Sequence, residues 1–217
     1  MKVLPIKPFE VEPWLTQKHY AKRMPSISYA FGAFVNGDLC GIVTYGTSAS
    51  STLRYGVCGK KWENCVIELN RLVCSNEKNF ASELVGKSIQ MLPKPSIVVS
   101  YADTAQGHVG YVYQATNFLY TGLSAKFKDP KVKGLEHQHH ATYANGLTNE
   151  QVIEKFGKDN VYFVDRPRKH RYIFLAGSKT QKKEMLKDLN YAVLPYPKGE
   201  SKKYDSGGAV AIQKVLF

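Results

Sequence analysis

The segment from Ser100 to Gly122 contains three side-chain types that together support acid–base chemistry. Asp103 ends the apolar run SIVVSYAD, His108 follows between two glycines, and Tyr113 lies further along in VYQATNF. A carboxylate, an imidazole and a phenol that converge at a strand end could bind an amine and remove its proton. Taken singly, Asp103 could cap a turn and His108 could be structural. Their grouping around glycines favours the functional interpretation.

Arg71 is a second candidate, in the strand-like run CVIELNRLVCS at residues 65–75. Strict alternation along a strand would place it on one face with Ile67, Leu69 and Val73. An arginine on an apolar face is costly unless it is paired or faces a ligand. It either forms an internal ion pair with a glutamate or directs its guanidinium at a phosphate or carboxylate.

The turn after this run, residues 76–79, leads into a segment whose apolar residues recur at helical spacing, residues 80–92. Backbone N–H groups at the start of such a helix, with Asn79 or Ser82 beside them, form a site for an anion. The plainer alternative is that Asn79 only caps the helix.

The elements that must position these residues follow in the order hairpin, strand, helix, strand, helix. Asn36-Gly37 predicts the tight turn of the hairpin, because both residues tolerate positive φ. The full set of predicted elements is a hairpin at 27–46, a strand at 65–75, a helix at 80–92, a strand at 96–103, a short helix at 110–122, a helix at 148–157, a strand in KHRYIFLAG and a basic helix at 179–189. This order predicts an α/β fold with a mixed central sheet, flanking helices and one parallel strand pair crossed over by a helix. We expect a single domain over residues 1–217, with a basic C-terminal extension from about residue 160.

The charge balance favours a polyanionic partner. The chain has 30 Lys and Arg against 18 Asp and Glu, a formal net charge of +12. Eleven of the basic residues and only three acidic ones lie between Arg166 and Lys203. Such a field attracts nucleic acid and releases counterions from its phosphates. The residues that we predict to contact nucleic acid are Arg168, Lys169, Arg171, Lys182 and Lys183.

The four cysteines form no CxxC pair, a pattern that fits a reducing compartment better than a zinc site or a disulfide scaffold. No run is apolar enough to span a membrane, and no secretory signal is evident at the N-terminus. The HQHH run at residues 137–140 is a weak metal candidate, since neighbouring histidines on a strand point to opposite faces. A solvated loop is the favoured interpretation of that run.

The central block, SYADTAQGH followed by VYQATNF and YTG, resembles that of the Mom proteins of bacteriophages and prophages. Three flanking pieces agree in order: His19-Tyr20, the ELNRLV strand, and the basic KHRYIFLAG to LPYPKG terminus. The resemblance covers about residues 15–200. It implies a GNAT-like acyltransferase fold and an enzyme that converts the N6 amine of adenine in double-stranded DNA to a carbamoylmethylated form. Such a modification protects phage DNA from restriction inside the cytoplasm of the bacterial host.

The resemblance also implies roles for individual residues. Asp103 and Tyr113 match the acid and the phenol of the family's active site, and His19 and Tyr20 match a further pair there. Arg71 and Ser82 match positions that contact a donor of the acyl-CoA type, with acetyl-CoA and iron as the implied cofactors. If iron takes part, His19 and His108 are the candidate ligands.

One departure concerns the turn into the helix. GNAT enzymes carry R/Q-x-x-G-x-G/A there, whereas this chain reads NEKNFA at residues 76–81. Two other functions stay open on the sequence: an ordinary GNAT acetyltransferase of small or protein amines, and a basic DNA-binding protein without catalysis. The missing glycine motif and the basic terminus disfavour the first, and the polar cluster at residues 100–122 is unexplained by the second.

Overall fold

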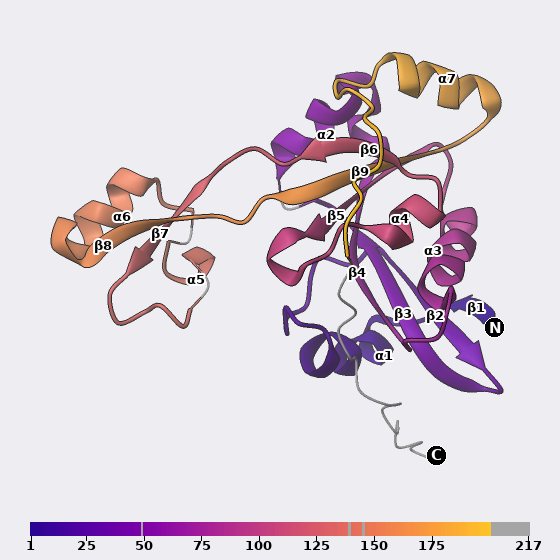
Figure 1. The fold of residues 1–217 in the computed structure, drawn as a ribbon, viewed down its shortest axis with the longest axis horizontal. Coiled ribbons are helices and arrows are strands. Elements are labelled where there is room, and N and C mark those ends of the chain that lie inside the picture. The colour runs from indigo at the N-terminus through magenta and orange to yellow at the C-terminus, as the bar shows by residue number, and fades with distance from the viewer. Residues whose placement is uncertain (49, 139, 145, 201–217) are drawn as a thin grey trace. The chain divides into compact units, whose positions relative to one another are not determined.

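A computed structural model describes residues 1–48, 50–138, 140–144 and 146–200 (Figure 1). The chain divides into two compact units, the first formed by residues 1–122 and the chain from residue 170 onward, the second by residues 123–169. In the described part of the chain, no helix is both long and apolar enough to cross a membrane.

The first unit is built on a seven-stranded mixed sheet with the order β1-β2-β3-β4-β5-β9-β6 (Figure 1). Its strands are β1 (Lys2–Pro5), β2 (Tyr29–Val35), β3 (Asp38–Gly46), β4 (Val66–Cys74), β5 (Ser96–Asp103), β6 (Leu119–Leu123) and β9 (Lys169–Ala176). Strands β1 to β4 pair antiparallel, and β4 pairs with β5 in parallel. The predicted mixed sheet with flanking helices is therefore confirmed.

Helices connect these strands and cover the sheet. They are α1 (Pro8–Pro13), the π-helix η1 (Trp14–Lys18), α2 (Ser51–Cys58), the 3₁₀-helices η2 (Lys60–Cys65) and η3 (Thr104–Gln106), α3 (Phe80–Met91), α4 (Tyr111–Ala115) and α7 (Lys179–Lys187). The crossover from β4 through α3 to β5 is the predicted parallel unit. The predicted hairpin is also present, with φ of 51° at Asn36 and 94° at Gly37 in its turn.

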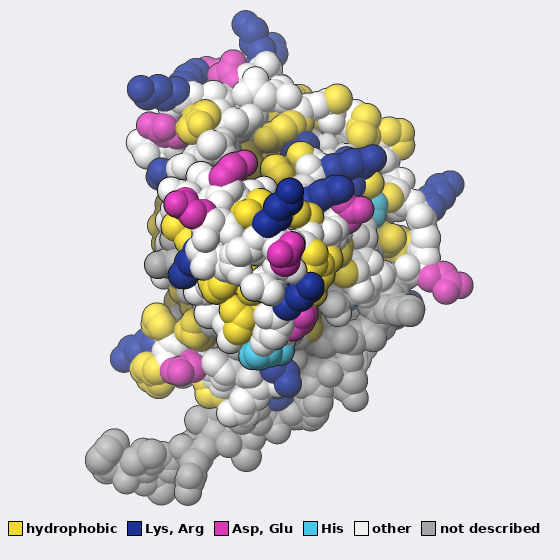
Figure 2. Space-filling view, turned by 90° about the vertical axis from the view of Figure 1, so that its left-hand side faces the viewer, with side chains coloured by type: hydrophobic (Ala, Val, Ile, Leu, Met, Phe, Trp, Pro, Cys, Tyr) yellow, Lys and Arg dark blue, Asp and Glu magenta, His cyan; other side chains and the backbone are white. Residues whose placement is uncertain are grey.

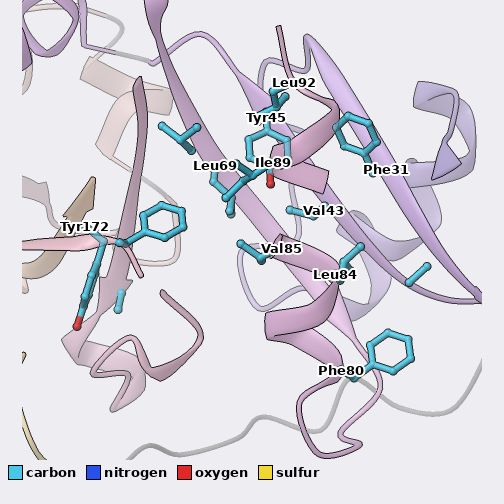
Figure 3. Packing of buried hydrophobic residues seen from close by; sticks show 14 of the residues in the cluster. Phe31, Val43, Tyr45, Leu69, Phe80, Leu84, Val85, Ile89, Leu92 and Tyr172 are labelled. Atoms are coloured by element: carbon cyan, nitrogen blue, oxygen red, sulfur yellow. The ribbon is translucent and has the colours of Figure 1, made fainter. Parts of the chain in front are cut away.

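The main core lies between α3 and one face of the sheet. Leu84, Val85 and Ile89 of α3 are at most 2% exposed and pack with Tyr45 and Leu69 of the strands (Figure 3). These helical residues recur at the 3.6-residue spacing that one buried face requires. Burial of these apolar side chains therefore holds α3 against the sheet. The position of α3 in turn sets the positions of the ends of β4 and β5, which it connects.

A second core occupies the opposite face of the sheet. Along β5, Val98 belongs to the α3 side, while Ile97 and Val99 pack with Val57 of α2 and Met185 of α7. Because successive strand residues point to opposite faces, the continuous apolar run of β5 is what a strand buried on both sides requires.

The predicted helix at residues 110–122 is wrong in its second half. Helix α4 ends at Ala115, and β6 begins at Leu119. Asn117 between them has a φ of 60°, a left-handed conformation that asparagine tolerates and that a helix cannot continue through. Leu119 and Tyr120 then enter the sheet beside β9.

The second unit is small and has its own core. It consists of β7 (Lys128–Val132), α5 (His140–Ala144), α6 (Asn149–Phe156), the 3₁₀-helix η4 (Lys158–Asn160) and β8 (Val161–Asp165). Strands β7 and β8 pair antiparallel, and Val132, Tyr143, Ala144 and Val152 form the cluster that holds the unit together. Helix α6 confirms the helix predicted at residues 148–157.

Candidate active site

A cavity of about 220 Å³ opens where the two parallel strands separate. The pairing of β4 with β5 runs only from Val66–Ile97 to Leu69–Ser100, yet both strands continue beyond it. The gap between their diverging ends is lined by β4, β5, the segment after η1 and the start of α4. Together with the turn before α3 and the first turn of that helix, which contribute Asn76 and Ala81, these segments are distant in sequence and meet at one place, and most of the predicted site residues come from them.

Arg71 lines this cavity because a β-bulge interrupts β4. The register with β3 shifts between Thr44–Arg71 and Tyr45–Leu69, which leaves Asn70 as the extra residue. Asn70 is anchored in the bulge by the Thr44 hydroxyl, 2.6 Å away, and by the carbonyl of Ser26, 2.8 Å away.

The bulge makes the predicted strict alternation wrong. Leu72 now packs with Leu69 against the α3 core, whereas Val73 belongs to the cluster around α1 and η1. Arg71 contributes its charge next to His19, where it lowers the histidine pKa. The arginine therefore shares the cavity with the N-terminal segment.

His19 is held in one protonation state by its surroundings. It is 5% exposed, and its Nδ1 accepts a hydrogen bond of 3.0 Å from the backbone N–H of Ala21. Burial lowers its pKa from 6.5 to about 4, helped by the positive charge of Arg71 and by His108. An imidazole that accepts at Nδ1 carries its proton on Nε2, so the neutral ring presents an N–H donor.

The low pKa of His19 predicts a loss of stability in mild acid. Above pH 6.5 the residue is neutral in both states, whereas between pH 6.5 and 4 only the unfolded chain takes up the proton. The free energy of unfolding should therefore fall as the pH falls through this window, by about 3 kcal/mol from this residue. Urea unfolding of the native chain and of His19→Asn at several pH values measures the difference. Asparagine keeps an acceptor for Ala21 without titrating.

The matched control is His137→Asn, which removes an exposed histidine of the second unit. We expect the native chain to lose stability relative to His19→Asn between pH 6.5 and 4, while the difference between the native chain and His137→Asn stays constant. Parallel curves for all three proteins would contradict the assigned state of His19.

Aromatic rings form much of the cavity wall. Tyr20 stacks on His19 with ring centroids 4.3 Å apart and meets His108 edge-on at 6.3 Å. Tyr101 of β5 and Tyr111 at the start of α4 also line the cavity, and sequence reasoning did not single them out. The signal for Tyr101 was its place two residues before Asp103. A wall of this kind suits a flat, π-rich ligand.

Asp103 ends β5 beside this wall. Its side chain accepts a 2.9 Å hydrogen bond from the backbone N–H of Ala105, which caps η3. Burial raises the pKa of Tyr20, and the negative charge of Asp103 raises it further. Burial lowers the pKa of His108, and the same negative charge opposes that decrease. The carboxylate thus caps a turn and also acts on two ring groups of the cavity.

Tyr113 lies on α4 and lines the cavity, and its phenol group stays protonated at neutral pH. Burial raises the pKa of its phenol to about 12, while a hydrogen bond with Ser100 opposes the rise. Its ring packs at 5.3 Å from Phe118 and 5.2 Å from Tyr172. A phenol in this state donates hydrogen bonds at neutral pH.

Ser82 lies apart from Arg71. It lines a second cavity, between α3 and α4, and its hydroxyl donates to the carbonyl of Asn79 at 2.9 Å. Asn79 precedes α3 in a left-handed conformation, with a φ of 63°, and its side chain makes no capping bond. Asparagine here adopts the backbone conformation that glycine favours, so the turn forms without the GNAT glycine motif. Ala81, in the first turn of α3, lines the first cavity.

His19 does not fit the implied iron. A metal-binding imidazole donates its second N–H to an acceptor, whereas the second nitrogen of His19 accepts from Ala21. Within residues 1–48, 50–138, 140–144 and 146–200, no three His, Cys, Asp or Glu side chains are grouped to hold an ion. Of the HQHH run, His137 is exposed and His139 lies outside the described residues.

The predicted nucleic-acid contacts fall in different surroundings. Lys182 and Lys183 are exposed on α7, which packs against α2 on the face of the sheet opposite α3. Arg171 is bonded to the carbonyl of Thr121 at 2.9 Å and lies 3.5 Å over the ring of Tyr191. Arg168 and Lys169 belong to the second unit.

Comparison with known proteins gives a family and several structural relatives. The model of the Mom protein family matches residues 1–198. The methylcarbamoylase mom of Escherichia phage Mu is 27% identical over 196 residues, which cover 83% of this chain and 77% of the phage protein.

Solved acetyltransferases are similar at low sequence identity. One from Bacillus subtilis in complex with CoA has a TM-score of 0.44 and 12% identity over 81% of this chain and 98% of its own. A GNAT family acetyltransferase from Elizabethkingia anophelis with acetyl-CoA bound has a TM-score of 0.44 and 9% identity over 81% of this chain and 97% of its own.

Proposed function

Because this chain belongs to the Mom protein family, we propose that it is a phage-type transferase that modifies the N6 amine of adenine in DNA with a carbamoylmethyl-type group. The family match over residues 1–198 carries the proposal, since that range includes every residue of the cavity. The substrate is the DNA of a phage in its bacterial host, and the modification protects it from restriction.

The ring-lined cavity suits an extruded base. Adenine N6 is engaged in a base pair inside the duplex, so the base must leave the stack before it reacts. The rings of Tyr20, His108 and Tyr111 offer surfaces on which it can lie.

Asp103 is the group best placed to take the proton. In the reaction N6 forms a bond to the methylene carbon of the carbamoylmethyl group and loses one proton, while the group previously bonded to that carbon departs with the bonding electron pair. His19 already uses the lone pair of its Nδ1 to accept the N–H of Ala21, so that nitrogen is engaged. The carboxylate of Asp103 acts beside Tyr20 and His108 and accepts the proton directly or through a water molecule.

Tyr113 assists the leaving group by hydrogen bonding. With a pKa of about 12 its phenol is a weaker acid than an ordinary thiol, whose pKa is about 8.5. Full proton transfer to a departing thiolate would be uphill, whereas a donated hydrogen bond stabilises the developing charge.

A CoA-bearing ligand would fit the gap between β4 and β5, and an acyl-CoA by itself would place a carbonyl carbon on N6, so the amide nitrogen of the product would come from a further reactant. Beyond Leu69 and Ser100 the two strands no longer bond to each other, so their facing edges offer backbone groups to an extended ligand. Arg71 and the first turn of α3, through Ala81, supply positive charge and N–H groups for phosphates. Ser82 would contact this ligand only if the ligand extended to the second cavity.

Nucleoside mass spectrometry tests the function. Plasmid DNA from cells that express the chain should contain a nucleoside heavier than deoxyadenosine by a carbamoylmethyl group, absent from vector-only cells. A different mass added to adenine would retain the enzyme class and change the donor. Unmodified DNA from cells with abundant folded protein would contradict the proposal.

In the same assay, Tyr113→Phe should reduce the modified fraction at limiting expression by roughly 10-fold or more, because one donated hydrogen bond to developing charge is lost. The melting temperature reports whether the Ser100 contact matters for folding. Tyr111→Phe is the matched control, since its hydroxyl bonds the carbonyl of Gly199. Equal losses in both variants would contradict the role given to Tyr113.

A further inference from the structure

The second unit contains a two-stranded ribbon that is longer than β7 and β8 alone. Ser124 donates its N–H to the carbonyl of Lys169 at 2.8 Å, and Arg166 donates to Phe127 at 2.8 Å, in line with the pairing from Lys128–Asp165 to Val132–Val161. Residues 124–132 and 161–169 thus form one antiparallel ribbon, hereafter the ribbon. At about 3.4 Å per residue it is about 27 Å long.

Positive charge in this unit is concentrated on the ribbon. Its sequence holds six Lys and Arg against two Asp, whereas residues 133–160 hold three Lys against four Asp and Glu. One of the six, Arg166, is paired with Asp129 by a bidentate contact. Lys126 and Lys128 are exposed and Lys131 is half-buried. The asymmetry within one small unit indicates a surface for a polyanion rather than a generally basic chain.

Exposed aromatic side chains lie among these charges. Phe127 is 55% exposed, Phe163 40% and Tyr162 38%. The small core of the unit covers the side of the ribbon that carries Pro130 and Val132, where Tyr143 donates to the carbonyl of Pro130 at 2.7 Å. The register places Tyr162 opposite Lys131, whose side chains point away from that core. Figure 2 shows Lys and Arg side chains beside hydrophobic ones on the face that it presents.

We propose that the ribbon binds the groove of double-stranded DNA, with its lysines on the phosphates and its exposed aromatic rings against the sugars or base edges. This inference rests on the proposed function, which requires a DNA substrate. The major groove accepts a two-stranded β-ribbon, and 27 Å is close to one helical turn of about 34 Å. Because the proposed binding surface and the reaction cavity are formed by different residues, the ribbon can hold the duplex while one base leaves its stack.

The test is the salt dependence of binding, measured with the full chain and a fluorescent 20-base-pair duplex over a series of NaCl concentrations. The variant Lys128→Gln/Lys131→Gln removes two charges of the ribbon, one from each of its two sides. Two lost phosphate contacts should reduce the slope of log K against log salt by about 1.8. Lys155→Gln/Lys158→Gln, on the helical side of the same unit, makes the same change in net charge and should leave the slope unchanged. Tyr162→Ala should weaken binding at high salt, where phosphate contacts contribute least.

Several outcomes would overturn the inference. The first is that the native chain and the ribbon variant show the same slope. The second is that the Lys155→Gln/Lys158→Gln control reduces the slope as much as the ribbon variant does. The third is that the native chain binds single-stranded DNA of the same sequence as tightly as the duplex. A slope reduced only by Lys182→Gln/Lys183→Gln would assign the contact to α7 instead. Base modification is scored separately, so a ribbon that binds duplex DNA in a chain that leaves adenine unmodified supports the inference and contradicts the proposed function.

Discussion

Asp103→Ala is expected to reduce adenine modification by about 100-fold or more, which is the smaller end of the range for a group that moves a proton in the transition state. The carboxylate lies at the end of β5 and acts electrostatically on Tyr20 and His108 in the cavity. The modified fraction of plasmid nucleosides at limiting expression measures the effect. The DNA-binding affinity should stay within about threefold of the native value.

The cap that Asp103 provides to Ala105 requires a control. Asp103→Asn retains an oxygen that accepts the N–H of Ala105, but it cannot take up a proton at neutral pH. We therefore expect the asparagine variant to unfold like the native chain and to be as inactive as the alanine variant. Substantial activity in Asp103→Asn would show that the residue only holds the turn.

Gly110→Ala is expected to destabilise the fold by about 3 kcal/mol or more. Gly110 has a φ of 86°, and a Cβ built on it would lie 2.7 Å from Cζ of Tyr172, which is fully buried. A side chain there combines left-handed strain with overpacking against a ring that has no room to move. The midpoint of urea unfolding gives the loss, and the start of α4, with Tyr113 on it, should be displaced as well.

A second glycine separates the two causes. Gly37 in the hairpin turn has a φ of 94°, and a Cβ added to it would have nothing within 4 Å, so Gly37→Ala should cost only the backbone strain of about 1 kcal/mol. Removing the ring in Tyr172→Ala should also make the further change Gly110→Ala much less costly, which a double-mutant cycle measures. Additive losses in that cycle would contradict the clash.

Local patterns predicted the scaffold of the site well. Asn36-Gly37 specified the hairpin, and the change from a strand-like to a helical spacing of apolar residues specified β4, α3 and β5 in order. These features are local, because a turn needs particular φ values and a helix needs one apolar face. The position of Asp103 at a strand end followed directly from them.

Other features depend on contacts between distant segments and escaped prediction. The bulge at Asn70 is held by Thr44 and Ser26, so alternation within β4 alone gave the wrong face for Arg71 relative to Leu69. The state of His19 follows from the backbone of Ala21 and from Arg71. Neither strand of the ribbon was predicted, because β7 carries Lys, Asp or Pro at all but its last position and β8 is largely exposed, so neither shows an alternating apolar pattern in the sequence.

The ends of the ribbon have a consequence for how the protein can vary. Ser124 and Lys169 are hydrogen-bonded to each other, and they directly join β6 and β9, which are neighbours in the sheet. Everything between them is an insertion whose entry and exit points coincide, so its length contributes little to the entropy of closing the parent fold. A unit joined in this way can be lengthened, shortened or replaced without a change in the pairing of its two ends, so the proposed DNA-binding ribbon can vary while the residues of the cavity stay the same.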